Sequence, residues 1–265
     1  MFFKFTVLLL GAGFAAAQSV SSQCSSALVS IAGSPDAACL NPSGLVGFVL
    51  TNSSTSVVSA VDSWLNGLCA LGPCSNSSLQ AVATNLTNGC SSELAGLGLS
   101  TNNSGSLATY LEAAYPTIRQ VLCLKDTSAN ELCVTEELTQ VQNSTGVTLT
   151  TSNIIGVVGE LTAGSQSIPQ SVTCGNCSKA SYTIAAKNYP ALVSASQSQV
   201  QATCGSSFTD GQMPSGIEET ASNSTSTSSG TTSSSTGSAA TLSVSSLNIG
   251  ITMLIAVSFV FTIFA

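Results

Sequence analysis

The stretch VVSAVDSWLNGLC, residues 57–69, places apolar side chains three and four positions apart and ends on a cysteine. That spacing puts those side chains along one face of an α-helix. Leu79, Val82, Leu86 and Cys90 repeat the pattern, again ending on a cysteine. Amphipathic helices that end on cysteines predict an all-α, disulfide-stapled bundle of six to eight short helices.

Working outward, the helical spacing recurs along most of the chain. A third apolar face covers 107–122, and we expect Pro116 to break or kink it. Ser128 and Glu131 have the spacing of a capping box, which predicts the start of a helix that buries Val134, Leu138 and Val141. Shorter helices are expected at 27–32, 154–161, 179–188 and 191–202, and strands only at 147–151 and 171–174. The Trp, Leu and Tyr side chains in these stripes are predicted to form the core.

Cysteine usage predicts an oxidising compartment. The chain has ten cysteines and no histidine. An even number of cysteines on a secretory route is typical of a disulfide framework, here of five bonds whose connectivity the spacing leaves open. The predicted disulfide residues are Cys24, Cys39, Cys69, Cys74, Cys90, Cys123, Cys133, Cys174, Cys177 and Cys204.

Cys174-Gly-Asn-Cys177 allows two sharper alternatives, a redox-active dithiol or half of a zinc site. A redox dithiol needs an electropositive setting, and tetrahedral zinc needs two further ligands. Without histidine those ligands would be cysteines, and Cys69 and Cys74 are poorly spaced for that role. Asn176 begins a glycosylation sequon between the two sulfurs, so we prefer structural disulfides and expect no metal or cofactor.

Both ends of the chain have the composition of segments that are removed. Residues 1–17 carry a lysine at position 4, an apolar run and a small-residue triplet at 15–17, which predicts a signal peptide. Small residues at 237–240, a polar spacer and an apolar run at 250–265 predict a glycosylphosphatidylinositol (GPI) attachment signal. Ser238 is the preferred attachment residue, then Gly237, with Asn223 a distant third. The alternative is a single-pass helix, which normally carries Lys or Arg on its cytoplasmic side.

These ends predict the organisation of the whole chain. We expect a signal peptide at 1–17, a cysteine-rich helical ectodomain at 18–219, a disordered Ser/Thr-rich stalk at 220–238 and a GPI propeptide with a hydrophobic tail at 239–265. The predicted location is the extracellular face of the plasma membrane or the cell wall. The predicted partners are the outer leaflet, through the lipid anchor, and cell-wall glucan.

The surface is predicted to be acidic and glycosylated. Twelve acidic residues oppose five basic ones in 265 residues, so the chain cannot neutralise phosphates and nucleic acid is excluded as a partner. Only 6% of residues are charged, which leaves glycans to solvate the surface. The sequons that could carry them begin at Asn52, Asn76, Asn85, Asn102, Asn143, Asn176 and Asn223.

The residue inventory argues against an enzyme. Without histidine there is no Ser-His-Asp or Cys-His machinery. Carboxylate chemistry remains, and a glycan hydrolase needs two carboxyl groups about 5–10 Å apart across a sugar cleft. Glu136 and Glu137 are adjacent and would point in different directions on a helix. The other carboxylates considered are Glu112, Glu160 and Asp210, and one Trp and four Tyr are few for a sugar cleft.

Three segments carry a resemblance to a known family. They are YPTIR at 115–119 continuing through CLKD at 123–126 to LCV at 132–134, CGNCSKA at 174–180, and CGSSFTDG at 204–211. As a set, over most of 24–219, they resemble a family of fungal secreted, cysteine-rich proteins, mainly from mushroom-forming species. The resemblance implies a signal peptide, a Ser/Thr-rich tail and a GPI anchor. That family has no assigned activity, so no catalytic residue is implied.

Two other functions are preferred to that of a hydrolase. The first is a non-enzymatic surface glycoprotein with a structural, protective or adhesive role. The second is a helical module that encloses a small apolar ligand, a lipid or sterol. Arg119, Lys125 and Asp126 look exposed and are the charges of most interest, although a local ion pair or helix cap is the preferred explanation for them.

Overall fold

A computed structural model describes residues 21–45, 54–96, 104–154, 157, 169–194 and 196–223. The predicted signal peptide, GPI propeptide and most of the stalk lie outside these residues, as do Asn52, Asn102, Glu160, Gly237 and Ser238. Apart from 220–223, the described residues belong to the predicted ectodomain, 18–219.

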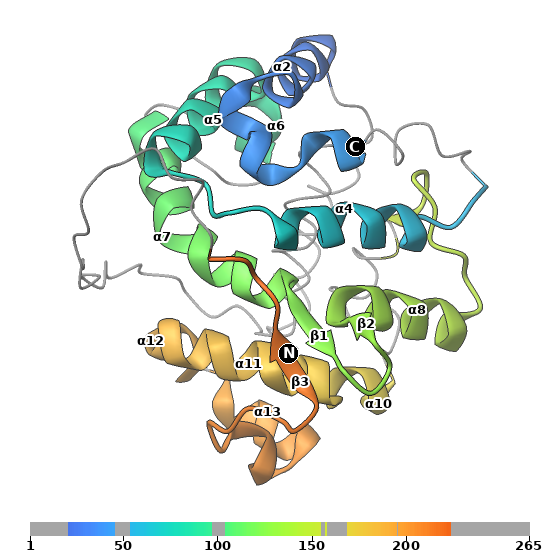
Figure 1. Ribbon diagram of the computed structural model, residues 1–265. Helices are drawn as coiled ribbons and strands as arrows, with labels where there is room; N and C mark the ends of the chain where they lie inside the picture. Colours follow the sequence, from blue (N-terminus) through green and yellow to red (C-terminus); the bar gives the residue numbers. More distant parts are fainter. Residues whose placement is uncertain are drawn as a thin grey trace, which may run out of the picture.

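The described chain is mainly helical (Figure 1). Its α-helices are α2 (Ser22–Ala32), α4 (Val58–Ala70), α5 (Asn76–Gly89), α6 (Ser91–Gly96), α7 (Ser104–Leu122), α8 (Cys133–Thr145), α10 (Gln170–Thr173), α11 (Asn176–Asn188), α12 (Pro190–Ser194) and α13 (Gln197–Cys204). Three 3-10 helices, η1 (Pro35–Leu40), η2 (Pro42–Leu45) and η3 (Ser206–Thr209), complete them. None of the helices described is long and apolar enough to cross a membrane.

The ten described α-helices exceed the six to eight predicted. The short α6 and α10 were not predicted, and the single helix expected at 191–202 is two, α12 and α13. Between α12 and α13, the Ser196 N–H bonds to Val193 O in a turn before the next helix begins. The helices expected at 27–32 and 179–188 begin earlier than predicted, at Ser22 and Asn176.

The two largest of four hydrophobic clusters in the described residues organise most of the helices. In the first, α2, η1 and α5 pack with α7 around Ile31, Leu86 and Leu107. The second centres on α4, whose Trp64 and Leu65 are 3% and 0% exposed, as the apolar stripe at 57–69 predicts. The Trp64 indole N–H donates to Leu40 O, which satisfies its buried polar group.

Pro116 lies inside α7, which continues from Ser104 to Leu122, so of the two predicted outcomes the break does not occur. A proline inside a helix removes one N–H donor and disturbs the carbonyls of the preceding turn. The Tyr189 hydroxyl donates to Ala113 O at 2.8 Å, beside the carbonyl at 112 that Pro116 leaves without its donor. A side chain from the start of α12 therefore supplies a hydrogen bond in the disturbed turn.

A small antiparallel sheet makes the fold less purely α-helical than predicted. Its strands are β1 (Leu124–Asp126), β2 (Glu131–Leu132) and β3 (Ile217–Glu219), in the order β2-β1-β3. Lys125 pairs with Leu132 on one side and with Glu218 on the other. Figure 1 shows β3 crossing beside β1 near α11. The last described segment of the chain is thus held against its middle.

The strand and capping predictions were wrong. Segment 147–151 is irregular because side chains take its hydrogen bonds: Gln142 accepts from the Leu149 N–H, and Asn153 donates to Thr148 O. Segment 171–174 lies in and after α10, which Pro169 starts by accepting two backbone N–H bonds. Ser128 and Glu131 do not form a capping box, because residues 127–130 are the turn between β1 and β2 and α8 begins only at Cys133.

All ten cysteines form disulfides, as predicted. The pairs are Cys24–Cys90, Cys39–Cys74, Cys69–Cys123, Cys133–Cys177 and Cys174–Cys204. Two of them tie α2 and η1 to the residues that flank α5. Cys133–Cys177 joins α8 to α11, Cys174–Cys204 joins the residue after α10 to α13, and Cys69–Cys123 links the end of α4 to the residue after α7. Multiple disulfides of this kind are typical of extracellular proteins.

Candidate functional site

The three segments singled out in the sequence meet around the N-terminus of α11. Disulfide Cys133–Cys177 joins the first to the second, and Cys174–Cys204 joins the second to the third. Lys179 adds an ion pair of 3.0 Å with Asp210 of the third segment. Carboxyl groups gather at this junction between α8, β1 and α11, which makes it the candidate site.

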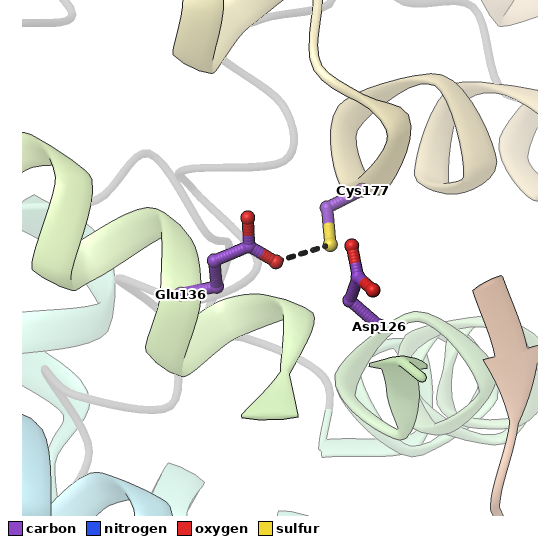
Figure 2. A group of neighbouring side chains, drawn as sticks. All are labelled: Asp126, Glu136 and Cys177. Atoms are coloured by element: carbon purple, nitrogen blue, oxygen red, sulfur yellow. Dashed lines mark hydrogen bonds between the residues drawn. The ribbon is translucent and has the colours of Figure 1, made fainter. Parts of the chain in front are cut away.

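The Glu136 side chain lies against the disulfide (Figure 2). Its Oε2 is 3.4 Å from Cys177 Sγ, and its Oε1 accepts a 2.7 Å hydrogen bond from Gln140 one turn along α8. Burial raises the pKa of the Glu136 carboxyl, and the negative charges of Asp126 and Glu131 raise it further. Glu136 is therefore easier to protonate than an ordinary glutamate.

Glu137 points to a different part of α11. Its Oε1 is 2.7 Å from the Ser178 hydroxyl, and the same hydroxyl is 2.8 Å from Val172 O in α10. Burial raises the pKa of Glu137 to about 7, against the lowering effect of the Ser178 hydrogen bond. Two adjacent glutamates thus contact two successive residues of α11, each with a raised pKa.

Asp126 is the third carboxyl group of the cluster, and its pKa is lowered, whereas those of the two glutamates are raised. Its Oδ1 accepts backbone N–H bonds from Ser128 at 2.6 Å and Ala129 at 3.2 Å, closing the turn after β1. Those bonds lower the pKa of Asp126, the one from Ala129 most strongly. The aspartate therefore stabilises the β1–β2 turn, a local role that is neither the ion pair nor the helix cap preferred from sequence.

One ligand atom from each of Asp126, Glu136 and Cys177 lies within 4.8 Å of the others. Figure 2 shows the three side chains directed toward one another. The sulfur is bonded to Cys133, so it is no thiolate and cannot serve as a strong metal ligand. The zinc and dithiol alternatives for the CxxC motif also require free or mutually paired cysteines, and Cys174 and Cys177 bond elsewhere.

Arg119 is buried, contrary to the expectation from sequence, with a side chain 4% exposed. Its guanidinium donates to Leu71 O and, at 3.0 Å, to Ser222 O. Nε has no hydrogen-bond partner, and the Tyr115 hydroxyl close by accepts from the Cys74 N–H. Arg119 therefore ties the segment after β3 to the segment after α4. Lys125 is half-buried within β1.

The carboxylates considered for hydrolysis do not converge on a sugar cleft in the described residues. Asp210 pairs with Lys179, and Glu112 is half-buried on α7, away from the α8–α11 junction. Trp64, the single tryptophan, lies in the core, and Tyr182 packs on Phe208 with ring centroids 5.6 Å apart. These aromatic rings have structural partners.

Two hollows open on the surface of the described residues near the C-terminal end of α8. One, of about 390 Å³, is lined by Ser56, Gln142, Asn143, Gly146, Val147 and Thr148. The other, of about 360 Å³, lies toward α10 and is lined by Gln140, Asn143, Ser144, Ser171 and Val172. Both are open, and side-chain amides and hydroxyls form much of their rims. Neither is the enclosed apolar chamber that a bound lipid or sterol would need.

The sequon asparagines in the described residues are all exposed. They lie on α5, on α8, at the start of α11 and after β3: Asn76, Asn85, Asn143, Asn176 and Asn223. Exposure is the condition that a glycan requires of the folded chain, so glycosylation stays a prediction with accessible sites.

Comparison of the chain with protein-family models, with curated proteins and with solved structures found no match.

Proposed function

We propose that this chain is a non-enzymatic glycoprotein of the extracellular surface, held to the membrane or cell wall by a GPI anchor, with a structural, protective or adhesive role. The disulfide framework carries the proposal, because all ten cysteines are used to fasten one element to another. A free thiol would have been the strongest nucleophile in a chain without histidine.

The remaining polar groups support the same reading. Asp126 closes a turn, Asp210 pairs with Lys179, and Arg119 binds backbone carbonyls. Each of these charges has a local structural partner. The exposed sequons and the scarcity of charged residues suit a surface that glycans cover.

The anchor is tested with the full chain made in a eukaryotic cell that attaches GPI. Phosphatidylinositol-specific phospholipase C should release the protein from washed cells, and mass spectrometry of its last peptide should place the glycolipid remnant on Ser238 or Gly237. The matched control lacks residues 250–265 and should be secreted into the medium. A cell-bound protein that resists the lipase and keeps its C-terminal peptide would establish the single-pass alternative instead.

The ligand-binding alternative is tested by native mass spectrometry of the secreted ectodomain, purified without detergent. A structural glycoprotein should give the mass of the chain with its glycans and five disulfides. Extra mass that disappears on denaturation, and that proves to be a lipid or sterol, would replace the proposed function with a binding function.

The hydrolase alternative is tested by incubating the same ectodomain with β-glucan and chitin oligosaccharides. We expect no new reducing ends above a heat-denatured sample. Release of reducing ends that Glu136→Gln abolishes would overturn the non-enzymatic proposal.

A further inference from the structure

The hydrogen atoms at the α8–α11 junction can be counted. Ser178 has one hydroxyl hydrogen, yet its Oγ lies within hydrogen-bond distance of both Glu137 Oε1 and Val172 O. The Val172 carbonyl oxygen can only accept a hydrogen bond. If Ser178 donates to Val172, the bond to Glu137 needs a proton on the glutamate. Both contacts are therefore satisfied at once only when Glu137 is a neutral acid.

The hydrogen-bond donors around the Glu136 carboxyl can be counted in the same way. Its Oε1 accepts from the Gln140 amide, which leaves Oε2 to face Cys177 Sγ at 3.4 Å. A disulfide sulfur carries no hydrogen and is at most a weak acceptor. The contact is a hydrogen bond only if Oε2 carries the proton. A neutral Glu136 thus gains a weak hydrogen bond here, whereas its carboxylate makes only a van der Waals contact with the sulfur.

The charges around Glu137 also disfavour its ionisation. The negative charge of Glu136 raises the pKa of Glu137, Asp126 and Glu131 act in the same sense on Glu136, and α10 (QSVT) contributes no ionisable group. On α11, Lys179 is engaged with Asp210. Lys125 and Asp126 are successive residues of β1, and successive side chains of a strand point to opposite faces of the sheet. The Lys125 side chain therefore points away from the face that carries Asp126.

We infer that Glu137, the Ser178 hydroxyl and the Val172 carbonyl form a proton-dependent clasp that joins α8 to α11 and α10. The clasp is closed when Glu137 donates to Ser178 and Ser178 donates to Val172. When Glu137 ionises, Ser178 turns to the carboxylate, and Val172 O keeps only the longer 3.3 Å bond from the Gly175 N–H. The Cys133–Cys177 disulfide still joins the helices, so the opening is local.

The sign of the pH dependence follows from the raised pKa of Glu137. Folding favours the protonated form, so the clasp is complete below the ordinary glutamate value of 4.5 and is lost as pH rises through about 7. Each unit by which the pKa is raised corresponds to about tenfold in the opening equilibrium. An acidic solution should therefore hold α10 more firmly against the start of α11, and a neutral solution should loosen this contact.

The test is hydrogen–deuterium exchange of the disulfide-bonded protein at pH values from 4.5 to 8, corrected for intrinsic exchange. Protection of peptides that cover α10 and the start of α11 should fall at least about tenfold across this range in the wild type, because the Ser178–Val172 bond is the one that ionisation breaks. Glu137→Gln, whose amide can donate to Ser178 at every pH, should remove most of that fall. Glu219→Gln, on exposed β3, is the matched control and should behave as the wild type.

A second measurement needs no variant. In protein labelled with 13C at the glutamate carboxyls, one resonance should titrate with a midpoint near the value given above for Glu137, well separated from the exposed glutamates. A titration of all glutamates near 4.5, or an unchanged pH dependence in Glu137→Gln, would overturn the clasp.

Discussion

Arg119 determines how the last described residues meet the rest of the molecule. A buried guanidinium loses its hydration, and here two backbone carbonyls from distant segments replace part of it. The Ser222 N–H bonds in turn to Cys69 O at 2.8 Å. One side chain on α7 thus fastens the segment after β3 beside the Cys69–Cys123 disulfide.

Replacing this side chain is expected to be costly. Arg119→Ala should lower the free energy of unfolding by about 2–4 kcal/mol, because hydrogen bonds to a charged group contribute about 1.5–3 kcal/mol and the buried stem leaves a cavity. Urea denaturation measures the loss. Lys187→Ala, an exposed lysine of α11, should change stability by no more than about 0.5 kcal/mol. Equal losses for the two variants would contradict the role given to Arg119.

Ionisable residues also predict an acidic stability optimum. Above pH 4.5, ionisation of Glu136 and Glu137 opposes folding, since both have raised pKa values. The rise in the pKa of Glu137 from 4.5 to about 7 corresponds to about 3 kcal/mol of stability that is present at low pH and lost near neutral pH. Thermal unfolding between pH 4.5 and 8 should show the melting temperature falling as pH rises.

Below about pH 4 the dependence of stability on pH reverses, and stability falls as the pH falls. Three carboxyls have pKa values lowered mainly by backbone N–H donors, so their contribution is present above the unfolded value and is lost as pH falls. They are Glu93, Asp126 and Asp210. The melting temperature should therefore peak between about pH 4 and 5. A maximum at neutral pH would contradict these assignments.

At the scale of elements, α2 and α5 approach closely through a glycine. A Cβ on Gly89 would lie 2.1 Å from the Ala27 Cβ, far closer than two non-bonded carbons can approach. The two helices are also joined by Cys24–Cys90, so they cannot separate freely. Gly89 is therefore required by packing.

Gly89→Ala should destabilise the protein by about 1–3 kcal/mol, the usual effect of overpacking. Gly33→Ala is the control, because a Cβ there meets its nearest atoms at an ordinary 3.6 Å. Adding Ala27→Gly to Gly89→Ala should recover part of the loss. Chemical denaturation of the four proteins measures these differences, and a neutral Gly89→Ala would refute the close approach.

The helices could be predicted because their apolar spacing is a local signal. The strands could not, since β1, β2 and β3 are two or three residues long and β3 pairs with β1 across about 90 residues of chain. The contact that supports α7 near Pro116 could not be predicted for a similar reason. The Tyr189 hydroxyl that supports the turn before Pro116 comes from far along the sequence.

At the scale of the whole molecule, the disulfides give a sharp prediction of connectivity. Protease digestion without reduction, followed by mass spectrometry, should recover Cys133 linked to Cys177 and Cys174 linked to Cys204. No peptide should contain a Cys174–Cys177 loop, because the two residues bond to different elements. Recovery of that loop would revive the redox interpretation of the CxxC motif.

The candidate site was only partly predictable. Sequence singled out Glu136, Glu137 and Asp126 as residues, and predicted that the adjacent glutamates would point in different directions. It could not reveal that α11 would meet both glutamates, because that contact depends on the pairing of Cys133 with Cys177. Arg119 was taken as exposed because charged residues usually are. Nothing in the local sequence indicates the two distant carbonyls that bind it.

The attachment of the last described segment has a mechanical consequence. A pull applied beyond Asn223 first loads the bonds from Ser222 and Thr220 to Cys69 and Cys123, then the β3–β1 pairing. Once these rupture, only residues 205–223 can be drawn out before tension reaches Cys204, which is bonded to Cys174. Nineteen extended residues span about 60–70 Å. The ectodomain would therefore yield a short, fixed length of slack under load and then resist through covalent bonds.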